Sequence, residues 1–389
     1  MEPASLVGRC LDESRQLLHR NLTPHGILAA SRTPQAEERS YTRIFGRDAA
    51  ICALGMAVSG DPVLQAGARD GLLTLARHQA ANGQIPKYVD PDTDMADFWY
   101  LGCIDATLWW LIAVRLLPRL APGDSTGAEL REPVTRALTW LSCQEHPQIF
   151  LVRQDEASDW ADIMPRSGFV LYSNALWYYV KRLYGLPGAD ETRFHFNHLL
   201  YPFSRDVPDY RRLRLLTHYV RNRAKHSELY LSFVNFSFWG EEGDVFGNLL
   251  AVLLGLAGDG PANRIVHALQ RAAADSPHPI ATVLRPIAPT DPLWRTYMGR
   301  HRQNLAWQYH NGGAWPFIGG FWVMALAALG KRQAAAEQLE RLAAANAVGG
   351  WGFNEWFHGR TGEPRGMPGQ SWNAAMFLLA HYALGANVF

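Results

Sequence analysis

The chain has 389 residues, with 37 Lys and Arg against 36 Asp and Glu, and 48% of its residues are hydrophobic. This composition is that of a globular protein and excludes a long disordered chain or a fibrous repeat. The formal net charge of +1 excludes the strongly basic surface of a dedicated nucleic-acid binder. The 14 Trp, 14 Tyr and 17 Phe could fill a large core or form flat platforms for sugars, and composition does not separate these uses.

Apolar residues recur at helical spacing along most of the chain and predict an all-α protein. The expected helices are 6–20, 48–58, 62–78, 104–117, 126–142, 170–183, 207–222, 244–256, 261–274, 318–329, 331–346 and 371–384. One segment, 228–239, alternates in polarity and is rich in aromatic residues, which predicts a short strand or hairpin.

Short and long connections alternate between these helices. The long loops are 21–47, 79–103, 143–169, 223–243, 275–317 and 347–370. Six helical hairpins closed into a ring would place all long loops on one face. The pattern therefore favours an (α/α)6 toroid, with one catalytic domain over 1–389 and a small β-containing insertion at 185–243. The alternatives are an irregular all-α domain and an open solenoid, although a solenoid would show a fixed repeat period and this chain has none.

The cysteines and the N-terminal segment favour a cytoplasmic protein. Cys10, Cys52, Cys103 and Cys143 form no CxxC or Cys/His cluster, so we expect reduced thiols and no metal site. Residues 1–18 lack the apolar core of a signal peptide, and no apolar run reaches the ~18 residues of a membrane span. We expect no cofactor, and neither nucleic acid nor membrane as a partner; a homo-oligomer is compatible with the sequence.

The first two long loops contain polar residues that could bind a ligand. Arg47 and Asp48 stand directly before a predicted helix, where Asp48 is explained equally well as an N-terminal cap. Tyr100 and Asp105 lie at the end of the second loop and are further candidate contacts.

The third long loop places a tryptophan between two carboxylates. Trp160 lies between Asp159 and Asp162, and Arg166 follows. A solvated acidic loop is the simpler interpretation, but an indole is an unusual choice for one. A carboxylic acid packed against an indole loses solvation and its pKa rises, as general-acid catalysis near neutral pH requires.

In the fifth loop, His310, Asn311 and Trp315 surround two glycines that would let a ligand approach the backbone. A lone His310 would more often be structural, but this cluster favours a functional role.

The sixth loop, 349–372, is rich in glycine and aromatic residues. It contains Glu355, a candidate base, and it ends with Gln370 and Trp372. Separate carboxylates, aromatic platforms and amide or guanidinium donors together describe a site for a small carbohydrate. Cleavage of a glycosidic bond needs one carboxylic acid for the leaving oxygen and one carboxylate that activates water or attacks directly.

Several of these motifs resemble those of known glycosidases. The segment from Phe45 to Asp48 resembles the FGRD motif of bacterial amylo-α-1,6-glucosidase-like proteins, and 309–316 resembles the YHNGGSWP stretch of alkaline/neutral invertases, glycoside hydrolase family 100. The loop around Asp162 is similar to the acid loop of trehalases and family 63 enzymes. Glu355 matches the base loop of the invertases, and the stretch that begins before Asp244 is also similar to them. The resemblance extends over residues 40 to 385.

This resemblance implies an (α/α)6 barrel and an inverting α-glucosidase mechanism. Asp162 would be the general acid, protonated against Trp160, and Glu355 the general base. Donors such as Asn354, Gln370 or arginines would keep Glu355 ionised. The remaining candidate substrate contacts are Phe45, Arg47, Asp48, Tyr100, Asp105, Trp160, Arg166, Asp244, His310, Asn311, Trp315, Gln370 and Trp372.

Three classes of function stay open at this stage. The first is a glycosidase that acts on sucrose, on an α-1,6-linked glucan or on glucosylglycerate; departures from the invertase pattern at 104–110 leave the substrate open. The second is a sugar epimerase of the acylglucosamine 2-epimerase type, which would use paired histidines such as His310 and His358. The third is a non-catalytic glycan-binding toroid. A separate acidic pair, Glu241 and Glu242, is interpreted as exposed and stabilised by a helix N-terminus.

Overall fold

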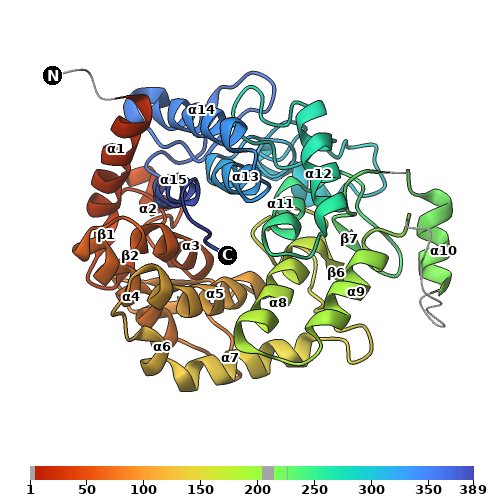
Figure 1. Cartoon of the computed structure of the whole chain (residues 1–389), viewed down its shortest axis with the longest axis horizontal. Coiled ribbons are helices and arrows are strands. Elements are labelled where there is room, and N and C mark those ends of the chain that lie inside the picture. The colour runs from red at the N-terminus through yellow and green to blue at the C-terminus, as the bar shows by residue number, and fades with distance from the viewer. Residues whose placement is uncertain (1–4, 204–213, 226) are drawn as a thin grey trace.

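Two kinds of helix alternate along the chain in this computed structural model, which describes residues 5–203, 214–225 and 227–389. The first kind is buried on nearly every side and forms an inner ring. Its helices are α3 (Gly46–Ala57), α5 (Ile104–Leu120), α8 (Leu171–Tyr184), α11 (Val245–Leu253), α13 (Pro316–Ala328) and α15 (Ser371–Ala383). Each inner helix packs against the next, and α15 returns to pack on α3, so the ring is closed (Figure 1).

The second kind of helix has one buried face and covers the ring from outside. These helices are α1 (Leu6–Asn21), α4 (Pro62–Arg77), α7 (Arg131–Gln144), α9 (Ala189–Leu199), α12 (Asp259–Arg271) and α14 (Arg332–Trp351). Each packs on an inner neighbour, and α1 joins α15 although the two come from opposite ends of the described chain. The predicted all-α (α/α)6 toroid is confirmed.

One expected helix was placed wrongly. The outer partner of α8 is α9, which the sequence analysis missed, whereas the expected helix 207–222 corresponds in part to α10 (Arg214–Arg223). Residues 207–213 lie outside the described residues, and α10 lies at the periphery of the molecule (Figure 1). Helix α9 is polar overall, but Thr192, Phe196 and Leu199 form a narrow buried face at helical spacing. The short helix α2 (Pro34–Glu38) was also not expected, and the expected helix 126–142 is divided at Leu130 into α6 (Thr126–Glu129) and α7.

Short antiparallel strands brace the connections. They are β1 (Leu22–Thr23), β2 (Gly26–Ile27), β3 (Ile44–Phe45), β4 (Tyr88–Asp90), β5 (Met95–Asp97), β6 (Phe169–Val170), β7 (Phe233–Val234), β8 (Trp356–Phe357) and β9 (Pro364–Arg365). The predicted hairpin in 228–239 contains β7, and Val234 also bridges Trp239. Strands are not confined to the expected insertion: β3, β4 and β5 form one sheet in the first two loops.

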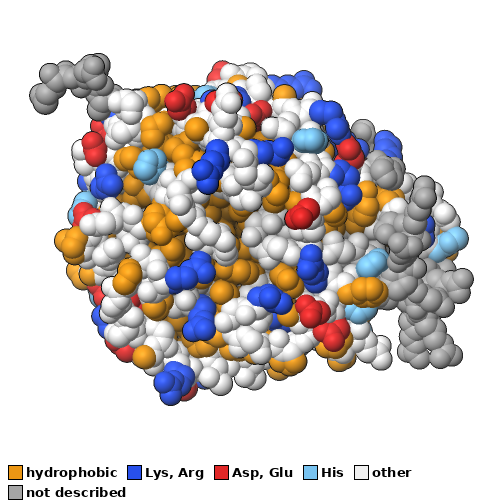
Figure 2. Space-filling model, in the orientation of Figure 1, with side chains coloured by type: hydrophobic (Ala, Val, Ile, Leu, Met, Phe, Trp, Pro, Cys, Tyr) orange, Lys and Arg blue, Asp and Glu red, His pale blue; other side chains and the backbone are white. Residues whose placement is uncertain are grey.

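The connections into the inner helices are long, and these helices run parallel, so the loops gather at the N-terminal ends of the ring. At the C-terminal ends, the tail up to Phe389 lies over the ring centre (Figure 1) and Phe389 packs on Phe321. Figure 2 shows Lys and Arg side chains on the viewed face, with hydrophobic side chains between them. Within the described residues, the helices are too short or too polar to cross a membrane.

Closure of the ring depends on the close contact of α3 with α15. A Cβ on Gly55 would lie 2.0 Å from the Ala375 carbonyl oxygen, a backbone atom that cannot move aside alone. We expect Gly55→Ala to lower the free energy of unfolding by about 1–3 kcal/mol, measured by urea denaturation, because overpacking forces the helices apart. In Gly260→Ala the new methyl group on α12 meets nothing within 4 Å, so this variant should be neutral or slightly stabilised. Equal stability of the two variants would contradict this role of Gly55.

Candidate active site

A pocket of about 330 Å³ is lined by residues of five of the six loops at the N-terminal ends of the inner helices. The predicted site residues that line it are Phe45, Arg47, Asp48, Trp160, Asp162, His310, Trp315, Glu355, Gln370 and Trp372. A pocket of similar size, about 320 Å³, lies by the C-terminal tail and is lined mainly by apolar side chains. The carboxylates therefore identify the first pocket as the candidate active site.

The start of α3 is placed by a close approach of two loops. A Cβ on Gly46 would lie 2.5 Å from the carbonyl oxygen of Pro86, so a larger residue would push the loops apart. The Gly46 N–H donates to the Lys87 carbonyl oxygen at 2.8 Å. Arg47 and Asp48 follow directly and line the pocket. Asp48 is not the helix cap, because that position is occupied by Phe45.

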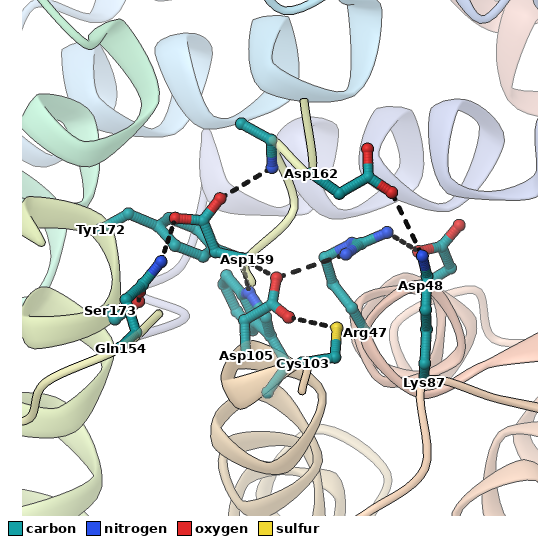
Figure 3. A network of polar contacts seen from close by, with 12 residues as sticks. Arg47, Asp48, Lys87, Cys103, Asp105, Gln154, Asp159, Asp162, Tyr172 and Ser173 are labelled. Atoms are coloured by element: carbon teal, nitrogen blue, oxygen red, sulfur yellow. Dashed lines mark hydrogen bonds and ion pairs between the residues drawn. The ribbon is translucent and has the colours of Figure 1, made fainter. Parts of the chain in front are cut away.

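Arg47 is held between two carboxylates in the interior of the barrel. Its guanidinium lies 3.1 Å from Asp48 Oδ1 and 3.3 Å from Asp105 Oδ2 (Figure 3). Asp105 is fully buried and also accepts hydrogen bonds from the Cys103 thiol and the Tyr172 hydroxyl, each at 3.0 Å. It lies outside the pocket lining, so it orients Arg47 from behind, whereas the sequence analysis expected a substrate contact.

Glu355 lines the pocket from the sixth loop and is almost fully buried. Its Oε1 accepts a hydrogen bond from the Tyr41 hydroxyl at 2.6 Å, and Oε2 accepts from the Met367 N–H at 2.9 Å. Burial raises the pKa of the Glu355 carboxyl to about 7, against the lowering effect of these two donors. The donors differ from those predicted, because Asn354 and Gln370 bond to backbone carbonyls instead.

Asp162 has a different environment from the one predicted. Its side chain is 30% exposed, and Oδ2 lies 3.2 Å from the Lys87 ammonium (Figure 3). The Trp160 ring packs edge-on against His310 and Trp315. The charged neighbour of the Asp162 carboxyl is therefore the Lys87 ammonium.

An aromatic cluster forms one wall of the pocket. Trp315 stacks on His310 at 5.3 Å between ring centroids, and Trp372 stacks on Phe317 at 3.9 Å. Burial lowers the pKa of His310 well below its usual range, so the imidazole is neutral. Among the described residues, Trp160 Nε1, Trp372 Nε1 and His310 Nδ1 have no hydrogen-bond partner. These three atoms are buried, but their residues line the pocket with flat rings, which suits a ligand with apolar faces.

Arg166 belongs to a second buried charged group behind the pocket. Its guanidinium lies 3.3 Å from Asp244 Oδ1 and 3.6 Å from Glu242 Oε1, and all three side chains are nearly inaccessible. Burial raises the pKa of Asp244 to about 6. The exposed position expected for Glu242 is therefore wrong. Arg166 and Asp244 support the acid loop and the start of α11, and neither lines the pocket.

Two other predicted contacts also lie outside the pocket lining. Tyr100 is 84% exposed, and its ring packs on Trp99. Asn311 is buried and exchanges hydrogen bonds with the backbone of Ile287, which fixes the fifth loop. His358, the expected partner of His310 in an epimerase, also lies outside the lining, and its ring accepts hydrogen bonds from its own turn.

The sequence analysis missed several residues that line the pocket. They are Ala29, Arg39, Ser40, Tyr41, Lys87, Tyr88, Trp99 and Tyr309. Tyr41 and Trp99 lie in the first two long loops and Tyr309 begins the stretch 309–316, so attention to every aromatic residue of those loops would have found them. Lys87 lies in the second long loop, but no local signal connects it with Asp162, which is 75 residues away.

Comparison with known proteins agrees with this geometry. Residues 234–386 match the family described as alkaline and neutral invertase. The probable alkaline/neutral invertase D of Arabidopsis thaliana is 23% identical over 456 aligned positions, which cover 98% of this chain and 83% of that protein.

Solved structures with the same fold include glycosidases. A GH63 mannosylglycerate hydrolase from Thermus thermophilus, in complex with Tris and D-glycerate, has a TM-score of 0.68 at 16% identity and covers 95% of this chain and 99% of its own. A wild-type glycosidase has a TM-score of 0.63 at 16% identity, and the match covers 98% of this chain and 97% of the glycosidase chain.

The closed double ring and these matches confirm the resemblance to (α/α)6-barrel glycoside hydrolases. The chain is a glycoside hydrolase, and its C-terminal part is similar to the alkaline and neutral invertases. The family match includes His310 and Glu355 but begins after Asp162 in the chain, so the role of Asp162 rests on its place in the pocket.

Gly366 keeps space for the Glu355 carboxyl. A Cβ there would lie 2.2 Å from Glu355 Oε2, and the residue has φ +76°. We expect Gly366→Ala to lower kcat/KM by about 100-fold, since a displacement near 1 Å has that effect on positioned groups. Gly349→Ala is the matched control, because Gly349 has φ +75° but a Cβ there meets nothing within 4 Å. The free energy of unfolding should fall by a similar amount in this variant, while kcat/KM should stay unchanged. Equal activity loss in both variants would contradict this role of Gly366.

Proposed function

We propose that the protein is an inverting glycosidase that releases glucose from a small α-glucoside or a short oligosaccharide. The observation that supports this most directly is that Asp162 and Glu355, from the third and sixth loops, line one pocket of about 330 Å³. Such a pocket suits one sugar ring and a compact leaving group. An acid and a base from different loops can act on opposite faces of the anomeric carbon.

The proposed reaction follows from the positions of Asp162 and Glu355 in the pocket. Asp162 donates its proton to the glycosidic oxygen as the bond to the anomeric carbon breaks. Glu355 takes a proton from water, whose oxygen attacks the opposite face of that carbon. Asp48, Arg47 and the unpaired indole N–H groups would bind hydroxyls of the sugar, and the rings of Trp315 and Trp372 would contact its apolar faces.

Sucrose is the first substrate candidate because of the similarity to invertases, and an α-1,6-glucoside follows. A glucoside with an acidic aglycone, such as glucosylglycerate, is the second candidate. Arg39 lines the pocket and is exposed, and among the described residues it makes no ion pair, so it could receive a carboxylate. The similarity to the mannosylglycerate hydrolase supports the same possibility.

The substrate and the stereochemistry can be tested together. We expect glucose release from at least one of sucrose, isomaltose, trehalose, panose and glucosylglycerate, with β-glucose as the first product in proton NMR before mutarotation. The two carboxyls of an inverting pair are ~6.5–9.5 Å apart, which leaves room for the attacking water. If α-glucose is released first, the inverting mechanism is wrong.

The pH dependence tests the base. Burial raises the pKa of Glu355 to about 7, and a protonated carboxyl cannot accept a proton, so kcat/KM should fall as the pH drops through about 7. The hydrogen bond from Tyr41 lowers this pKa, so Tyr41→Phe should move the fall in activity to higher pH.

Tyr88→Phe is the matched control for the pH experiment. Tyr88 also lines the pocket, but its hydroxyl bonds to Arg43. Its pH profile should follow that of the unmodified protein. An unchanged profile in Tyr41→Phe, or the same shift in both variants, would exclude Glu355 as the titrating base.

A further inference from the structure

Asp162 is attached to the rest of the pocket mainly through Lys87. The Lys87 ammonium donates a hydrogen bond to Asp162 Oδ2 at 3.2 Å, and this is the contact with a charged group that the Asp162 side chain makes among the described residues. The carboxyl is 30% exposed and stands on a loop, whereas Glu355 has two donors and is almost fully buried. The position of the acid therefore depends on a single cationic side chain.

Lys87 is itself held tightly along its whole length. Its N–H donates to the Asp97 carbonyl oxygen and its carbonyl oxygen accepts from Gly46, both at 2.8 Å. Its ammonium lies 3.6 Å from the centroid of the Trp99 ring, and only 11% of the side chain is exposed. Because the backbone and the charged end are both fixed, little conformational entropy is lost when Lys87 meets a carboxylate.

This arrangement places a fixed positive charge where negative charge develops during the reaction. As the glycosidic bond breaks, its electron pair stays with the leaving oxygen, and that oxygen takes the proton of Asp162. Asp162 thereby becomes a carboxylate beside the Lys87 ammonium. The ammonium attracts a carboxylate more strongly than a neutral carboxylic acid, so it stabilises the transition state more than the enzyme with Asp162 protonated.

We propose that Lys87 is a positioning residue for proton donation, which holds the Asp162 carboxyl toward the leaving group and stabilises the carboxylate formed there. This rests on the proposed role of Asp162 as the acid. Two other roles would use the same contacts: Lys87 could only fix the loop that carries Asp162, or it could bind the substrate directly. The three roles differ in how the effect of a substitution depends on the leaving group.

The test compares substrates that need the acid to different degrees. Lys87→Met keeps the apolar stem and removes the charge. We expect kcat/KM to fall about 100-fold for neutral alkyl and unactivated aryl α-glucosides, because their leaving groups require protonation. α-Glucosyl fluoride releases fluoride, a stable anion, so its hydrolysis should fall less than about threefold. Lys87→Arg, which retains a cation, should recover a large part of the activity on the alkyl glucosides.

The controls separate this proposal from the proposed function. Asp162→Asn should show the same selective loss; if it loses nothing on alkyl glucosides, Asp162 is not the acid and both proposals fail. Lys225→Met, which removes an exposed lysine, should leave all rates unchanged. Another outcome is that Asp162→Asn behaves as expected while kcat/KM of Lys87→Met falls by the same factor on every substrate, including the fluoride. In that case Lys87 has a structural role or binds the sugar, and only the Lys87 proposal is overturned. A rise in KM with unchanged kcat for neutral substrates would overturn it in the same way.

Discussion

The burial of Arg47 between two carboxylates is the interaction on which the candidate site depends. A guanidinium in the interior is tolerated only if its charge is compensated, and Asp48 and Asp105 provide that compensation. This requirement links three inner helices. Arg47 and Asp48 belong to α3, and Asp105, at the start of α5, accepts a hydrogen bond from Tyr172 of α8 (Figure 3). Removal of Arg47 would take the shared partner from both buried carboxylates, and removal of either carboxylate would leave Arg47 with one partner in place of two. The end of the first loop is therefore held in place where it lines the pocket.

The two catalytic candidates, Glu355 and Asp162, have opposite electrostatic surroundings. Glu355 lies in a dry environment with neutral donors, so burial dominates and raises its pKa. Asp162 lies nearer to solvent and beside an ammonium. The two carboxyls thus differ in burial and in the charge of their neighbours. Tyr41, Met367 and Lys87 are those neighbours, and they come from three separate loops.

The order of the inner helices could be predicted because their apolar residues recur at helical spacing and long loops precede them. The loops that carry Asp48, Asp162, His310 and Glu355 could be recognised from clusters of polar and aromatic residues. Contacts between residues of different loops could not be predicted. Tyr41 donates a hydrogen bond to Glu355, which is 314 positions away, and nothing in the sequence around either residue indicates the other. Helix α9 was missed because its buried face is narrow and lies in a polar segment. Asp105 and Arg166 were predicted to contact the substrate because a sequence does not show on which side of a pocket wall a charged side chain is buried.

The contact of α15 with α3 and α1 has a consequence for synthesis of the protein. Translation adds about 5–20 residues per second, so Glu355 follows Asp162 by roughly 10–40 s. Throughout that interval the barrel lacks its last inner helix, so the apolar face of α3 that α15 will cover stays exposed, and the corresponding face of α13 joins it once that helix is synthesised. The nascent chain thus holds Asp162 and the other pocket-lining residues of the first three loops well before the pocket is complete. Addition of α15 covers these apolar faces and closes the ring.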